Sequence, residues 1–118
     1  TAVVTAIQGG QSAVVPVLPV VDTIRTVDEG GNITGSIPRD SLRAAQTPQG
    51  FRREILERAH EQAQGPATDD VALVEALGIA VYGLPGHEDA FKITRPLDAL
   101  LAEAVVARRA SHTRRDRE

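Results

Sequence analysis

The sequence contains no cysteine, and this absence removes several classes of chemistry. Disulfide bonds, thiolate metal sites and cysteine nucleophiles are all excluded. A chain without cysteine is compatible with the cytoplasmic location that we expect. No apolar run is long enough to span a bilayer, so no membrane partner is expected. No signal peptide is visible, and because the sequence begins at Thr1 without a methionine, we expect its own start to lie further upstream.

Positive charge is also scarce. The formal net charge is −3, and the only stretch rich in arginine is Arg114-Arg115-Asp116-Arg117 at the end. Duplex nucleic acid is therefore not expected as a partner. We expect residues 110–118 to form a solvated, disordered tail.

The common catalytic signatures are missing as well. The sequence has no G-x-G-x-x-G, G-x-x-x-x-G-K-[ST], G-x-S-x-G or H-E-x-x-H motif. His60, His87 and His112 have no carboxylate at ligand spacing, which favours ordinary surface histidines over metal ligands. Asp69 and Asp70 could hold a metal ion, but two carboxylates suit the positive end of a helix equally well.

The chain of 118 residues, with 42% hydrophobic residues, is long enough for one domain with a core. Its patterns predict a helix end, a strand, a β-hairpin, a strand, two helices, two strands and a final helix, which is an α/β order. The expected helices are 1–7, 51–63, 69–77 and 95–109, and the expected strands are 13–20, 23–27, 33–37, 42–47, 79–84 and 90–93.

Three of these elements carry specific expectations. The apolar run at 13–20 is typical of a strand covered on both faces, while Pro16 and Pro19 favour either an edge position or an early exit from the sheet. The hairpin has little apolar surface of its own, so we expect it to lie against another body. Thr68 and Thr94 are expected to cap helices, the second of which would bury a stripe of apolar residues. That stripe consists of Leu97, Leu100, Leu101, Ala104 and Val105.

A set of hydroxyls and cations lies at the ends of the predicted elements. Its members are Thr23, Arg39, Thr47, Thr68 and Lys92. Arginine offers a planar fork, lysine a point charge and threonine a neutral donor, so the set suits a phosphate group. The alternative is that Thr68 is only a cap, Thr47 only a turn residue, and the two cations only solvated charges.

Five short blocks give the sequence a family resemblance. They are Asp22-Thr23-Ile24-Arg25, Pro38-Arg39, the stretch from Leu42 to Phe51 with Thr47-Pro48-Gln49 at its centre, Thr68-Asp69-Asp70, and Phe91-Lys92-Ile93-Thr94. In this order and spacing they resemble the C-terminal half of the 2-C-methyl-D-erythritol 4-phosphate cytidylyltransferases, the nucleotidyltransferases of non-mevalonate isoprenoid biosynthesis. The resemblance extends from about Thr1 to about Val106.

The resemblance implies a fold, a reaction and a set of partners. Residues 1–118 would form the C-terminal half of a single Rossmann-like nucleotidyltransferase domain, with residues 19–41 as a protruding β-arm that makes a homodimer. The enzyme would transfer CMP from CTP to 2-C-methyl-D-erythritol 4-phosphate and release pyrophosphate. Thr47, Thr68 and Lys92 would bind the acceptor phosphate in one subunit, while Thr23 and Arg39 would reach the site of the neighbouring subunit.

The family's other half has no counterpart in this sequence. The glycine-rich loop, its basic residues and the acidic residue associated with Mg²⁺ would all lie there, so no catalytic residue and no metal ligand is assigned to this chain. We therefore expect a piece left by cleavage, or a half whose partner is a separate chain, with little activity alone. Two alternatives remain open: a non-catalytic dimerisation module, and a related nucleotidyltransferase for another polyol phosphate.

Overall fold

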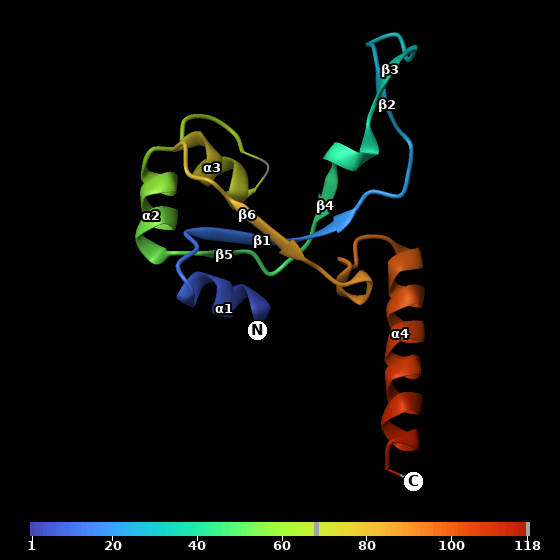
Figure 1. Cartoon of the computed structure of the whole chain (residues 1–118). Coiled ribbons are helices and arrows are strands. Elements are labelled where there is room, and N and C mark those ends of the chain that lie inside the picture. The colour runs from blue at the N-terminus through green and yellow to red at the C-terminus, as the bar shows by residue number, and fades with distance from the viewer. Residues whose placement is uncertain (68, 118) are drawn as a thin grey trace. The chain divides into compact units, whose positions relative to one another are not determined.

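The computed structural model describes residues 1–67 and 69–117 of the chain. It divides into two compact units, Thr1–Gly86 and His87–Glu118. Within the described ranges, no helix is both long and apolar enough to cross a membrane. The helices and strands of both units are coloured along the chain in Figure 1.

The first unit contains three α-helices and six strands among its described residues. In chain order its elements are α1 (Ala2–Gln8), β1 (Ala13–Pro19), β2 (Ile24–Val27), β3 (Ile33–Ile37), the 3₁₀ turn η1 (Arg39–Ser41), β4 (Arg43–Ala45), β5 (Gly50–Phe51), α2 (Arg53–Glu61), α3 (Asp70–Ala76) and β6 (Tyr82–Pro85). The second unit contains the 3₁₀ turn η2 (Glu88–Ala90) and α4 (Pro96–Arg115). The predicted α/β class is thus confirmed.

Strand β1 is the centre of the first unit. It pairs with β6 in parallel on one side, and with β5 and then β4 in antiparallel fashion on the other. Its first four residues are buried. Because successive side chains of a strand point to opposite faces, Ala13 and Val14 contribute to two different clusters. The prediction that this strand is covered on both faces is therefore confirmed.

The two clusters hold the helices against the sheet. Val14 packs with Val3 of α1 and Leu84 of β6 on one face. Ala13 packs with Ala59 of α2 and Val74 of α3 on the other. Figure 1 shows α1 on one side of β1, and α2 and α3 on the opposite side.

Of the two alternatives predicted from the prolines of β1, the edge position is wrong, since this strand has neighbours on both sides. The strand ends at Pro19. The reason lies in the ladder around Pro16. Its carbonyl accepts from the amide of Gln46, 2.8 Å away, so its nitrogen faces the same side. On that side the partner of β1 changes from β5 to β4. The missing N–H of Pro16 thus falls in a break between two ladders and costs no strand-to-strand hydrogen bond.

The predicted hairpin is present as a separate two-stranded sheet, β2 and β3, paired from Ile24 opposite Ile37 to Val27 opposite Ile33. It projects from the four-stranded sheet (Figure 1). Every residue of β3 is exposed. Val27 and Ile33 are each 61% exposed, so the hairpin presents apolar side chains that this chain does not cover.

Two predicted helix caps are wrong. Asp69, and not Thr68, is the N-cap of α3, where its carboxylate accepts from the amide of Ala72 at 3.0 Å. Arg95, and not Thr94, is the N-cap of α4. At α3 the acid that follows the threonine takes the cap, because a carboxylate is the stronger acceptor for a helix-terminal amide. At α4 the carboxylate of Asp98 accepts from the amides of Thr94 and Arg95, and the hydroxyl of Thr94 donates to it in place of capping the helix.

The second unit differs from the prediction in three further ways. The expected strand at 90–93 is absent, since η2 ends at Ala90 and residues 91–94 have no regular structure. Helix α4 continues past the predicted end at Arg109 to Arg115, so residues 110–115 are helical and not a disordered tail. Of residues 96–115, all of which the structure describes, none is buried, and Leu97 and Leu100 are 64% and 62% exposed. One helix and one short loop provide too few apolar partners to cover the predicted stripe.

Candidate functional site

A cavity of about 450 Å³ opens beside Thr47 in the first unit. It is lined by Thr47, Gln49, His60, Ala63, Gly65, Ala67, Asp69, Asp70 and Leu73. Thr47 and Gln49 come from the turn that links β4 to β5, with Pro48 in a cis peptide bond between them. The other residues come from the end of α2, the connection after it and the start of α3. A turn at the end of a strand and the start of a helix thus face one cavity.

The acidic side chains in this cavity are both engaged. Asp69 caps α3 through the amide of Ala72. Asp70 lies in the first turn of α3, and its Oδ1 is 2.8 Å from Nε2 of His60 on α2. Of the two sequence interpretations of Asp69 and Asp70, the structure supports the helix start. The part of the chain that the structure describes holds no group of three His, Cys, Asp or Glu side chains placed for a metal ion.

The cavity is lined by two acids, so a phosphate bound there needs additional positive charge. Thr47 supplies a neutral hydroxyl donor, whereas Asp69 and Asp70 supply negative charge. Like charges repel strongly when they are only partly solvated. A phosphate beside Thr47 therefore needs cations that the described lining does not supply, apart from a protonated His60.

Thr23 and Arg39 lie together at the base of the hairpin and not in this cavity. Thr23 immediately precedes Ile24, the first residue of β2, and Arg39 follows two residues after Ile37, the last residue of β3. Ile24 and Ile37 pair across the hairpin, which brings the two ends of the hairpin together. The Nη1 of Arg39 donates to the carbonyl of Val21 at 2.8 Å. This bond uses one of the five guanidinium donors, and it turns the arginine toward the chain entering the hairpin.

Two residues of the predicted set remain, Thr68 and Lys92. Thr68 is outside the described residues. Lys92 belongs to the second unit, where it is exposed in the irregular segment between η2 and α4. The structure thus brings Thr23 and Arg39 together at one place, and it places Thr47 and Lys92 in different units.

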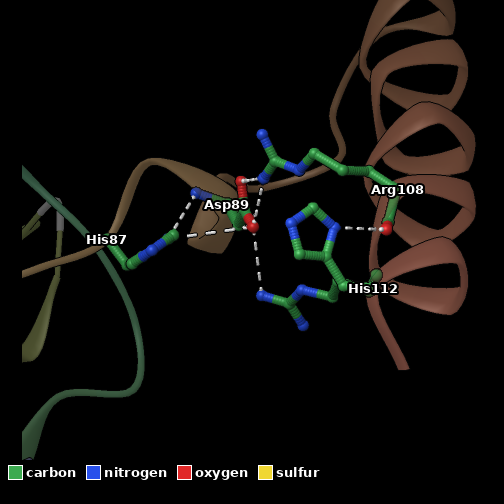
Figure 2. A network of polar contacts seen from close by, with 5 residues as sticks. His87, Asp89, Arg108 and His112 are labelled. Carbon is green, nitrogen blue, oxygen red and sulfur yellow. Dashed lines mark hydrogen bonds and ion pairs between the residues drawn. The ribbon is translucent and has the colours of Figure 1, made fainter. Parts of the chain in front are cut away.

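The segment around Lys92 is attached to α4 by two carboxylates. Asp89 accepts from Nη2 of Arg108 at 2.6 Å and 2.7 Å and from Nη2 of Arg109 at 3.3 Å. Asp98 accepts from the amide and hydroxyl of Thr94 and from the amide of Arg95, all at 2.9 to 3.0 Å. Figure 2 shows Asp89 between His87 and Arg108, with His112 directed at the backbone carbonyl of Arg108.

These contacts lower the pKa of both carboxyl groups. The hydrogen bond from Arg108 is the main cause for Asp89, and the amide of Thr94 is the main cause for Asp98. Each bond favours the ionised carboxylate over the neutral acid. Both groups are therefore ionised at neutral pH.

We expect the second unit to be weakened by acid. A folded-state pKa below the ordinary carboxyl value of 3.8 means that the ionised Asp89 stabilises the fold fully above that pH. The contribution declines as the pH falls below 3.8 and is lost below the lowered pKa. Amide exchange of α4 at a series of pH values measures this effect in the parent and in Asp89→Asn. The difference in amide exchange between the two proteins should shrink toward low pH. A difference that grows toward low pH would mean that the pKa of Asp89 is not lowered in the folded state.

Gln49, His60 and Asp70 line the cavity but are not members of the phosphate-binding set predicted from the sequence. Gln49 lies within the Thr-Pro-Gln block, and its position two residues after Thr47 is the only signal that marks it. His60 and Asp70 are ten positions apart on two different helices, so their contact depends on how α2 packs on α3.

Comparisons with known proteins place this arrangement in a family. Residues 1–108 match the family model described as IspD: 2-C-methyl-D-erythritol 4-phosphate cytidylyltransferase. The enzyme of that name from Rhodococcus jostii is 56% identical over 104 residues, which are 88% of this chain and 46% of the relative. The Frankia casuarinae enzyme is 51% identical over 107 residues, 91% of this chain and 40% of the relative.

Solved structures agree in fold. The 2-C-methyl-D-erythritol 4-phosphate cytidylyltransferase of Thermus thermophilus superimposes with a TM-score of 0.78 at 42% identity. The superposition covers 89% of this chain and 52% of the Thermus chain. The chain therefore spans less than half the length of the two curated relatives and about half of the solved one. It belongs to the IspD family of 2-C-methyl-D-erythritol 4-phosphate cytidylyltransferases.

Proposed function

We propose that this chain forms the acceptor-binding and dimerising part of an enzyme that transfers CMP from CTP to 2-C-methyl-D-erythritol 4-phosphate. In this reaction an oxygen of the acceptor phosphate attacks the α-phosphorus of CTP. The new bond joins the two phosphates, and the bond from the α-phosphorus to the bridging oxygen breaks as pyrophosphate leaves. The family match over residues 1–108 is the observation that carries the proposal.

The residues of the chain suit the acceptor side of such a reaction. Phosphoryl transfer depends mainly on positioning the nucleophile and on offsetting charge, because both reactants are anions. Thr47 lines the cavity and offers a neutral hydrogen-bond donor. Thr68 is another threonine of the proposed acceptor-binding set. The proposed set also contains two cations, Lys92 and Arg39, and a hydrogen bond from a charged donor to a phosphate is stronger than one from a neutral donor.

The position of Arg39 suits a contribution to a second subunit. It lies with Thr23 at the base of an exposed hairpin, outside the lining of the cavity beside Thr47. An exposed two-stranded ribbon with uncovered apolar side chains gains stability by lying on another body. A homodimer built by the hairpin would bring Thr23 and Arg39 of one subunit to the acceptor phosphate of the other.

The family resemblance also implies Mg²⁺. The described residues hold no three-ligand cluster for it, and the two acids nearest the cavity are occupied as a helix cap and as the partner of His60. The residues that the structure describes therefore do not fit a metal site, and we assign no step to the ion.

A chimera tests the proposed function. All 118 residues of this chain replace the matching segment of the Rhodococcus jostii relative, and pyrophosphate release is measured with CTP and 2-C-methyl-D-erythritol 4-phosphate. We expect turnover that requires both substrates, and little or none from the 118-residue chain alone. Phosphates of other polyols serve as competing acceptors. Preference for one of them would replace the proposed acceptor, and a folded chimera without any turnover would contradict the proposal.

The exposed apolar side chains of the hairpin are the proposed dimer interface, and charging them tests it. Val27 and Ile33 are cross-strand partners and exposed, so replacing both by glutamate puts two charges where the proposed dimer buries apolar surface. Sedimentation of the chimera should change from dimer to monomer, with its thermal stability otherwise retained. The control Thr34→Glu, on the same exposed strand, adds a charge without removing an apolar side chain. A dimer that persists in the Val27 and Ile33 variant would place the interface elsewhere.

A further inference from the structure

The location of Lys92 raises the question of what holds its backbone in place. Residues 91–94 have no regular structure, and the lysine is exposed. A lysine that binds a phosphate loses side-chain conformational freedom, and a mobile backbone adds to that cost. A fixed segment reduces the cost and keeps the charge near one position.

The two ends of this segment are attached to α4 in different ways. After Lys92, Asp98 holds the amides of Thr94 and Arg95, which is what a carboxylate in the first turn of a helix normally does. Before Lys92, Asp89 is held by Arg108, nineteen positions further along the chain. Arg108 lies three turns into α4, so helix initiation does not explain this contact.

The Asp89 contact has the features of a built interaction. The side chain of Asp89 is only 8% exposed, although that of Arg108 is 54% exposed. Both carboxylate oxygens accept from Arg108, and Arg109 adds a third hydrogen bond. The amide of Asp89 donates to Nδ1 of His87 at 3.0 Å, which fixes the start of the turn. An ion pair of this kind contributes little to stability on average, so its effect is mainly on geometry.

We propose that Asp89 is a positioning residue for Lys92: by binding Arg108, it fixes the loop that presents the lysine to the acceptor phosphate. This inference rests on the proposed function, because it assumes that Lys92 binds that phosphate. Asp89 itself touches neither substrate. Its loss should therefore reduce acceptor binding through Lys92 and leave CTP binding unchanged.

Kinetics of the chimera test the inference. Asp89→Asn keeps the shape of the side chain and removes the charge, and Arg108→Gln removes the partner. Each should raise the KM for 2-C-methyl-D-erythritol 4-phosphate about tenfold, with the KM for CTP within about twofold. Glu88→Gln is the matched control, because this exposed acid lies on the same turn and removes the same charge. It should leave both KM values within about twofold. An unchanged acceptor KM in Asp89→Asn would overturn the inference.

A double-mutant cycle separates positioning from general damage. If Asp89 acts through Lys92, Asp89→Asn should cause no further loss in a Lys92→Ala background. The full tenfold loss in that background would show a role independent of Lys92 and overturn the inference. If Lys92→Ala alone leaves the acceptor KM unchanged, the assigned role of Lys92 fails, and the inference fails with it. If Lys92→Ala raises the acceptor KM and Asp89→Asn does not, the inference about Asp89 is overturned and the proposed role of Lys92 is retained.

Folding is checked independently of activity. Arg108→Lys keeps the positive charge but presents one compact donor group, and it serves if Asp89→Asn fails to fold. Amide exchange at residues 91–94 of the 118-residue chain should rise in either variant and stay at the parent level in Glu88→Gln. Equal exchange in all four proteins would mean that the ion pair does not fix the loop, which overturns the inference.

Discussion

Replacing Val14 by aspartate is expected to remove much of the stability of the first unit. Val14 is fully buried on the central strand, between Val3 of α1 and Leu84 of β6. No described side chain in that cluster can pair with a carboxylate, and leaving a buried charge unpaired costs about 3–5 kcal/mol. A natural domain has only about 5–15 kcal/mol of stability in total. Urea denaturation followed by far-ultraviolet circular dichroism measures the loss.

The matched control for this substitution is Val4→Asp. Val4 is next to buried Val3 on α1 but is 51% exposed. The same change of side chain should cost less than about 1 kcal/mol there, since the carboxylate stays in water. Similar unfolding midpoints for the two variants would contradict the assignment of β1 as the centre of the core.

The parts of the fold that depend on local sequence were predicted well. The turn-rich stretch between Val27 and Ile33 indicates a hairpin because few residues tolerate such turns. The apolar run from Ala13 indicates a strand covered on both faces, because no polar residue interrupts it. Both signals are contained in a few neighbouring residues, so they survive without knowledge of the tertiary structure.

The errors arise where a residue's effect depends on distant parts of the chain. Pro16 excludes one hydrogen bond, but whether that places β1 at an edge depends on where β4 and β5 begin. The apolar stripe of α4 indicates that one face of the helix packs against other residues, but it does not indicate which residues these are. The sequence could not show that this chain leaves Leu97 and Leu100 exposed.

In the candidate site, too, the features determined by neighbouring residues were predicted, and those that depend on distant residues were not. Thr47 was found from the proline that follows it and from the strand that precedes it. The pairing of His60 with Asp70 was missed, because the two residues share no sequence motif and meet only when α2 packs on α3. Asp89 and Arg108 are even further apart in sequence, and only the structure brings them together.

Replacing Arg39 by alanine should weaken acceptor binding far more than folding. In this chain Arg39 makes an exposed hydrogen bond to a neutral carbonyl, that of Val21, whose loss costs only about 0.5–1.5 kcal/mol. Losing a charge-assisted contact to phosphate costs about 1.5–3 kcal/mol, or about 10- to 150-fold in acceptor KM. Steady-state kinetics of the chimera and its thermal unfolding measure the two effects. A collapse of thermal stability with an unchanged acceptor KM would contradict the assigned role.

Arg43→Ala is the control for Arg39→Ala. Arg43 is also an exposed arginine near the base of the hairpin, and its Nη1 likewise donates to backbone carbonyls, those of Asp40 and Leu42. It is not a member of the proposed phosphate-binding set. The acceptor KM should therefore change by no more than about twofold. Arg39→Lys should recover only part of the loss, because an ammonium group lacks the planar fork of a guanidinium.

Mixing two variants with weakened acceptor binding tests whether Arg39 serves the neighbouring subunit. If Arg39 acts across the dimer and Thr47 acts within its own subunit, Arg39→Ala and Thr47→Ala each damage both sites of their own homodimers. In a mixed dimer one site receives both intact residues and the other receives neither. Random exchange makes half of all dimers mixed, so about a quarter of the sites should regain full activity. If Arg39 and Thr47 act in the same subunit, every site keeps one defect, and mixing restores nothing.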